Sequence, residues 1–198
     1  MKHPEGSLAS STRSFDDTTP LAREIAENTR RRQAIAAETL PLPGETRVFT
    51  VANQKGGVGK TTTTVNLAAA LAREGARVLV IDLDPQGNAS TALGVEHRAD
   101  TVSVYDVIIS DIPMADAVQK SPEFDGLYCL PATIHLAGAE IELVSLVARE
   151  QRLRTALDIF LNDSPEPFHY VFIDCPPSLG LLTINAFVAA KEIGRAHV

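Results

Sequence analysis

Short apolar runs alternate with helical patterns along most of the chain. Four runs are rich in branched residues and end in turn or acidic residues, which is typical of strands covered on both faces. These runs are residues 47–52, 77–82, 127–131 and 170–174. Because strands alternate with helical segments, we predict an α/β domain with a doubly wound, mainly parallel sheet of four strands.

Apolar positions recur at helical spacing between these runs. The clearest pattern covers residues 60–73, and Gly75 lies where a left-handed cap would end that helix. A long helix is predicted over 136–161, in which the charged residues 150–154 are expected to face water. Further helices are predicted over residues 89–93, 103–109, 114–120 and 181–190.

Residues 1–45 differ from the rest and are predicted to form a flexible leader. Residues 1–19 are polar and short of large apolar groups, so we expect a mobile tail. A short amphipathic helix is predicted over 20–38, with Arg30, Arg31 and Arg32 falling late in it. Contact with DNA or a membrane surface is an alternative for these arginines, but neighbouring glutamates favour a solvated face. Prolines at 41 and 43 then indicate a linker.

Composition restricts the class of protein. The chain of 198 residues is 44% hydrophobic, enough for one substantial core. The net charge is −7, and residues 48–198 carry eleven basic against eighteen acidic residues, which excludes a nucleic-acid binder that acts through overall charge. No run reaches the roughly 18 apolar residues of a membrane span. Cys129 and Cys175 lack zinc-site spacing and are expected to be buried thiols. We expect a cytoplasmic protein without a membrane partner.

Residues 53–64 read N-Q-K-G-G-V-G-K-T-T-T-T between a predicted strand and a predicted helix. Glycines let the backbone turn tightly around an anion, and a triphosphate needs aligned N–H donors, a cation and Mg²⁺. Lys60 is expected to contact the β- and γ-phosphates, and the Thr61 hydroxyl to bind Mg²⁺. The predicted nucleotide-binding residues of this phosphate loop are Gly56, Gly57, Val58, Gly59, Lys60, Thr61 and Thr62.

Acidic residues end two of the predicted strands. Asp174 follows four apolar residues and is the candidate that binds Mg²⁺ through water, in a Walker B role. Asp84 is placed to orient a hydrolytic water, and the alternative is a turn aspartate over residues 85–88. Two roles are equally open for Asp82: an indirect contact with the metal, or a plain carboxylate at the end of a strand.

The motif K-G-G-V-G-K-T-T resembles the deviant Walker A motif of the ParA/MinD family of ATPases, because Gln54 replaces the first Walker A glycine. The resemblance implies that Lys55 is catalytic and reaches the nucleotide of a second copy, so that ATP binding makes a sandwich dimer. It also places Gly56 at the close dimer contact. Lys60 and Asp84 are the other catalytic residues that it implies, with ATP and Mg²⁺ as cofactors.

The motifs D-L-D-P-Q-G-N-A-S at 82–90 and I-D-C-P-P-S-L-G at 173–180 resemble the ParA/Soj branch, which partitions chromosomes and plasmids. The resemblance implies a P-loop fold of the SIMIBI type over residues 46–191, incomplete at its C-terminal side. It further implies a ParB-type partner, non-specific DNA binding through a missing C-terminal part, and association with the nucleoid.

Alternative functions remain open within this motif class. They are a MinD-like positioning ATPase, a phosphotransferase or metal-cluster-loading relative, and a regulatory module that binds nucleotide without turnover. Residues 192–198, E-I-G-R-A-H-V, break from the apolar strand expected there and resemble a translated sequencing adapter. We therefore expect a non-native tail at the end of a truncated chain.

Overall fold

The computed structural model describes residues 19–37 and 41–194, and the chain divides into two compact units, residues 1–40 and residues 41–198. Residues 1–18 of the predicted mobile tail, and residues 195–198 of the predicted non-native tail, lie outside the described residues. In the described part of the chain, no helix is long and apolar enough to cross a membrane.

The first unit contains helix α1 (Pro20–Ala37), in agreement with the predicted helix over 20–38. Thr19 caps its start, because its hydroxyl oxygen accepts a hydrogen bond from the Ala22 N–H at 3.2 Å, and Pro20 suits the first helical position. The last turn of α1 contains no basic residue. Arg30, Arg31 and Arg32 therefore lie before the position at which the helix dipole favours cations most.

The second unit is built on one sheet in the order β3-β4-β2-β5-β1-β6. All neighbouring strands are parallel except β3 and β4. This confirms the mainly parallel α/β fold. The described strands are β1 (Arg47–Val51), β2 (Val78–Asp82), β3 (Gln119–Lys120), β4 (Leu127–Leu130), β5 (Tyr170–Asp174) and β6 (Glu192–Gly194).

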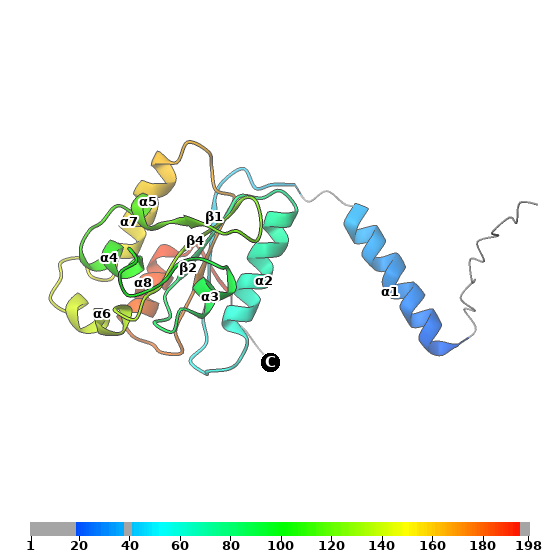
Figure 1. Ribbon diagram of the computed structural model, residues 1–198, viewed down its shortest axis with the longest axis horizontal. Helices are drawn as coiled ribbons and strands as arrows, with labels where there is room; N and C mark the ends of the chain where they lie inside the picture. The colour runs from blue at the N-terminus through cyan, green and yellow to red at the C-terminus, as the bar shows by residue number, and fades with distance from the viewer. Residues whose placement is uncertain (1–18, 38–40, 195–198) are drawn as a thin grey trace, which may run out of the picture. The chain divides into compact units, whose positions relative to one another are not determined.

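Helices cover both faces of this sheet (Figure 1). Helices α2 (Lys60–Arg73) and α3 (Asn88–Ala92) pack on one face, where Ala68 and Ala72 bring the backbone of α2 close to β2 and β5. The opposite face carries α4 (Val104–Ile109), α5 (Met114–Ala117), α6 (Leu136–Leu143), α7 (Arg152–Asp163) and α8 (Leu181–Ala189).

The strands explain these two layers by simple alternation. In β2, Leu79 and Ile81 face the α7 side, whereas Val78 and Val80 face α2. Since successive side chains of a strand point to opposite faces, a strand covered on both sides must be apolar throughout. At the end of α2, Gly75 has φ of +87° and supplies the predicted left-handed cap.

The predicted long helix over 136–161 is wrong, because it is broken between α6 and α7. Ala148 has φ of +51°, a left-handed value that a right-handed α-helix excludes. Asn185 of α8 holds the break: its amide nitrogen donates to the Arg149 carbonyl oxygen at 2.8 Å, and its oxygen accepts from the Leu153 N–H at 3.2 Å. Nor does all of 150–154 face water, since the Arg152 side chain is 14% exposed.

Two strands lie outside the four that were predicted. The predicted helix over 114–120 ends at Ala117, because Gln119 and Lys120 pair antiparallel with β4 as strand β3. Residues 192–194, assigned from the sequence to a tail, pair with β1 as strand β6. These additions form the two edges of the sheet, beside β4 and β1, and β5 lies inside it between β2 and β1.

Candidate functional site

The chain turns from β1 into α2 through the predicted phosphate loop. Gly57 and Gly59 have φ of +71° and +77°, so a side chain at either position would be strained. No side chain caps the start of α2, and its first N–H groups therefore remain available to an anion. The glycine pattern thus produces the loop and the open helix start that it predicted.

Lys60 and Lys55 have opposite environments in this loop. The Lys60 side chain is buried, and its Nζ donates to the Lys55 carbonyl oxygen at 3.1 Å. Lys55 is exposed, and its N–H donates to Asn53 Oδ1 at 3.0 Å. Among the described residues, no carboxylate forms an ion pair with the Lys55 ammonium group. Lys60 therefore belongs to the loop, whereas Lys55 projects from it.

Asp174 lies directly beside the start of α2. The Thr61 hydroxyl donates to Asp174 Oδ2 at 2.7 Å, and the buried Thr64 hydroxyl donates to Oδ1 at 3.4 Å. The contact follows from the topology, because β5 pairs with β1 and aligns Asp174 with Val51, the last residue of β1. The structure thus brings together the two residues that were predicted to hold the metal.

Asp82 and Asp84 are joined by a turn at the end of β2. Asp82 Oδ1 accepts from the Asp84 N–H at 3.1 Å, and its Oδ2 accepts from the N–H and hydroxyl of Ser90, both at 2.8 Å. Asp84 Oδ1 accepts from the Gln86 N–H at 3.0 Å. Asp84 is therefore a turn aspartate, and this geometry leaves its predicted role in hydrolysis open.

Burial controls the protonation of this carboxylate cluster. Burial raises the pKa of Asp174 to about 7, against the hydrogen bond from Thr61 and the charge of Lys60, and the charges of Asp82 and Asp84 raise it further. Burial also raises the pKa of Asp82, against its hydrogen bonds to Ser90. Since Asp82 and Asp174 are paired in the sheet, a cation placed between the loop and β5 would stabilise both ionised forms.

The residues suit a metal that is shared with a ligand. Within the described part of the chain, no three His, Cys, Asp or Glu side chains form a metal cluster. Mg²⁺ bound with a nucleotide uses one or two protein oxygens together with waters and phosphates. The Thr61 hydroxyl and Asp174 match that donor set.

Three residues of the site were not predicted from the sequence, namely Asn53, Thr64 and Ser90. Thr64 belongs to the four threonines that follow Lys60, and it is buried one helical turn after Thr61. Ser90 ends the D-L-D-P-Q-G-N-A-S motif that begins with Asp82, the acid whose carboxylate it contacts. The predicted buried state of Cys129 and Cys175 is confirmed, and burial raises the pKa of both thiols.

A loop with left-handed glycines, a buried lysine and a Thr–Asp contact at the carboxyl edge of a parallel sheet defines a P-loop nucleotide-binding fold. A family model described as an AAA domain, AAA_31, matches residues 46–193. The chain belongs to this family, and within it to the ParA/Soj type of ATPases.

The sporulation initiation inhibitor protein Soj of Bacillus subtilis is 50% identical over 147 residues, 74% of this chain and 56% of Soj. The chromosome partitioning protein ParA of Caulobacter vibrioides is also 50% identical, over 74% of this chain and 54% of ParA. The chain therefore spans about half the length of the curated relatives that it matches.

Among solved structures, cobyrinic acid a,c-diamide synthase from Mycobacterium smegmatis, with bound ATP analogue and magnesium, is similar with a TM-score of 0.69. It is 45% identical, and the match covers 76% of this chain and 59% of that one. The agreement supports the P-loop fold over the second unit of the chain.

Proposed function

We propose that the chain is the nucleotide-binding part of a partition ATPase that binds ATP with Mg²⁺ and hydrolyses it. The observation that carries this proposal is the contact between the Thr61 hydroxyl and Asp174 at 2.7 Å, directly after a loop shaped by Gly57 and Gly59. The bound ATP analogue and magnesium of the Mycobacterium smegmatis relative support the choice of ligands.

The residues of the loop divide the binding of a triphosphate among them. Backbone N–H groups of residues 56–62 donate to phosphate oxygens, and the Lys60 ammonium leaves the Lys55 carbonyl for the β- and γ-phosphates. Mg²⁺, when bound, neutralises the charge that develops on these oxygens. The Thr61 hydroxyl is its proposed ligand, and Asp174 its acceptor through water, with Asp82 in indirect contact.

Asp84 is the proposed group that orients the attacking water. Its N–H is held by Asp82, and its Oδ1 by the Gln86 N–H, so the turn fixes the direction of the carboxylate. A rigid acceptor of this kind contributes by positioning, since phosphoryl transfer needs little covalent chemistry from the protein.

A second copy of the chain would complete the site. Lys55 is exposed without a described acidic partner, and a Cβ built on Gly56 meets nothing within 4 Å. Gly56 also lacks a left-handed φ. The chain's own packing therefore gives no reason for a glycine there, and close approach by a partner does. We propose that ATP joins two copies, with Lys55 reaching the partner's nucleotide.

The wider role is proposed from the relatives. Caulobacter ParA is named for chromosome partitioning, and Soj for sporulation control. We propose that the natural protein works in the cytoplasm at the nucleoid, where its ATP-bound dimer binds DNA non-specifically and a ParB-type partner stimulates hydrolysis. Plasmid partition is the same activity on another replicon.

Three variants of the protein test these assignments. Calorimetric titration measures ATP binding, light scattering measures dimerisation, and phosphate release measures hydrolysis. Lys60→Ala should fail to bind ATP, Lys55→Ala should bind ATP as a monomer, and Asp84→Ala should bind and dimerise without hydrolysis. Normal hydrolysis by Asp84→Ala would contradict its role. If the unaltered protein binds ATP but releases no phosphate with DNA and partner present, it is a regulatory module without turnover.

A further inference from the structure

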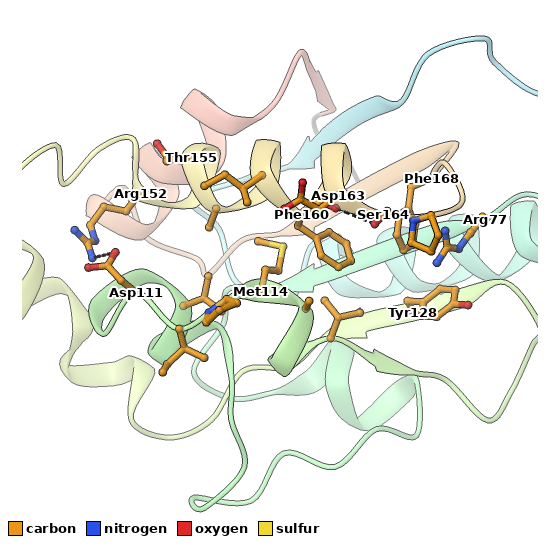
Figure 2. Close-up of a pocket in the computed structure, with 18 of the residues that line it drawn as sticks. Arg77, Asp111, Met114, Tyr128, Arg152, Thr155, Phe160, Asp163, Ser164 and Phe168 are labelled. Carbon is orange, nitrogen blue, oxygen red and sulfur yellow. Dashed lines mark hydrogen bonds and ion pairs between the residues drawn. The ribbon is translucent and has the colours of Figure 1, made fainter.

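A cavity of about 810 Å³ lies along α7, and its lining includes no residue of the phosphate loop. Figure 2 shows it extending from the Arg152–Asp111 ion pair to the rings around Phe168, with Met114 and Phe160 between these ends. Its volume is within the range of sites that take small molecules. We call it the α7 cavity.

The walls of the α7 cavity are largely apolar and partly uncovered. Val147, Ile159 and Ile112 line it and are 88%, 57% and 37% exposed. Met114 is buried against the main core and forms part of the floor. Exposed apolar side chains that converge on one cavity favour a ligand with an apolar body.

One end of the cavity carries a cation with unused hydrogen-bonding capacity. The Arg77 guanidinium lies 4.2 Å from the Phe168 ring centre and 5.0 Å from that of Tyr128. One of its terminal nitrogens donates to the Glu166 carbonyl oxygen, but its buried Nε has no hydrogen-bond partner among the described residues. A carboxylate oxygen of Glu166 lies 4.0 Å from that same Nε, beyond hydrogen-bond distance, and Glu166 is 79% exposed, so water screens this ion pair.

The other charged side chains of the cavity wall are less suited than Arg77 to bind an anion. Arg152 is paired more closely, because its ion pair with Asp111 is 2.5 Å long and it also donates to the Ile108 carbonyl oxygen. Lys120 is paired with Asp125 at 2.8 Å, and since it is 56% exposed it lacks the ring packing that holds the Arg77 guanidinium. Asp163 lines the cavity as well, and its negative charge opposes an anionic ligand.

We propose that the α7 cavity binds a small amphipathic carboxylate, with its carboxylate at Arg77 and its apolar chain along Met114 and Phe160. A planar guanidinium matches a carboxylate in geometry, and the two rings beneath it hold its plane in place. The site is separate from the phosphate loop, and its occupation does not require a nucleotide.

Decanoate, decanol and decylamine serve as probes, through competition with fluorescent anilinonaphthalene sulfonate. We expect decanoate to compete with a stoichiometry of one, and decylamine to compete at least about tenfold more weakly, because only the anion pairs with Arg77. Thr155→Phe places a ring at the exposed mouth of the cavity and should weaken decanoate at least about tenfold.

Charge variants test the orientation of the probe. Arg77→Met should weaken decanoate about tenfold while leaving decanol unchanged, and Asp163→Asn should strengthen decanoate. The matched control is Arg154→Met, since Arg154 lies on α7, outside the cavity, and pairs with Asp158. Circular dichroism shows whether Arg77→Met remains folded, and Thr155→Phe tests the site if it does not.

Two results would overturn the proposal. One is decanoate binding that Thr155→Phe leaves unchanged, or that is weaker than decylamine binding. The other is no probe binding together with self-association that Thr155→Phe abolishes, which would assign the cavity to a second copy of the chain.

Discussion

The phosphate loop and the α7 cavity are both concentrations of functional groups, but they are built in different ways. The loop gathers backbone donors and polar side chains where three neighbouring parallel strands end. The α7 cavity gathers apolar side chains from segments far apart in the chain, with one underused cation at its end. A site of the first kind is visible in a motif, whereas one of the second kind appears only after folding.

The two regions also differ in how strongly their charges are satisfied. Thr61 and Ser90 donate short hydrogen bonds of 2.7 and 2.8 Å to buried carboxylates, and Thr64 adds a longer one of 3.4 Å. Arg77 is half-buried against two rings, and its Nε has no hydrogen-bond partner in the described part of the chain. The loop thus suits the proposed cation, and the cavity the proposed anion. Substitutions in each region should show this difference.

The largest expected effect is at Lys60. Lys60→Ala should lower ATP affinity at least about 100-fold, since it removes a buried cation and its charge-assisted bonds to phosphate. Arg73→Ala, at the exposed far end of α2, is the control and should leave affinity unchanged. Calorimetric titration measures both. Equal affinities for the two variants would remove Lys60 from the site.

Gly126 tests the framework beside Arg77. It has φ of +79°, and a Cβ there would lie 2.9 Å from the Ala76 carbonyl oxygen. Gly126→Ala should lower the free energy of unfolding by roughly 2–3 kcal/mol. Gly138→Ala lies inside α6, where a Cβ would meet only Glu142 Oε1 at an ordinary contact distance of 3.7 Å, and it should instead raise the free energy of unfolding by about 0.5 kcal/mol. Urea unfolding measures both, and a neutral Gly126→Ala would contradict the account of this turn.

Asp174 tests the electrostatics of the phosphate loop without any metal. Its folded pKa is raised from 3.8 to about 7, so the folded chain binds the proton more tightly and loses stability as pH rises toward and through 7. Asp174→Asn removes the buried charge and should raise the free energy of unfolding by roughly 1–2 kcal/mol at about pH 8.

The same gain should be smaller at about pH 5, where Asp174 is protonated in the folded chain, and should approach zero only below 3.8, where the unfolded chain is protonated as well. Thermal unfolding in chelator, with wild type and variant compared at each pH, separates Asp174 from the parallel contribution of Asp82. A gain that is larger at low pH would reverse the sign and contradict the burial argument.

The smallest effects distinguish two arginines of α7. Arg152→Met should cost about 1 kcal/mol, because Arg152 bonds the end of α4 and the Asp111 carboxylate. Arg154→Met should cost less than about 0.5 kcal/mol, because its pair with Asp158 is exposed. Similar losses for both would mean that the Arg152 contacts add nothing to stability.

The prediction from sequence was accurate where one residue type has one physical use. Gly57 and Gly59 adopt the left-handed backbone that only glycine accepts readily, and Gly75 does so at the end of α2. Asp174 was predicted, as an acid at a strand end, to share a metal with Thr61, and the two side chains are in contact because β5 ends beside the loop. These assignments depend on local chemistry and on a topology with few alternatives.

The prediction failed where a distant segment decides the local structure. The break between α6 and α7 contains no proline or glycine, and it is held by Asn185 from α8. Gln119 and Lys120 are a strand only because the edge of β4 is available. Arg152 and Arg154 are two residues apart in sequence, and only their neighbours in space distinguish a buried role from an exposed one.

The claim that Thr61 and Asp174 hold Mg²⁺ with ATP is tested most directly by titrating the wild-type protein and its Asp174→Asn variant with ATP, with and without Mg²⁺. We expect one ATP per chain, bound at least about tenfold more tightly with Mg²⁺ in the wild type, and no gain from Mg²⁺ in the variant. Wild-type binding that is indifferent to Mg²⁺, or an Asp174→Asn variant that keeps the full gain, would contradict the metal site assigned to Thr61 and Asp174.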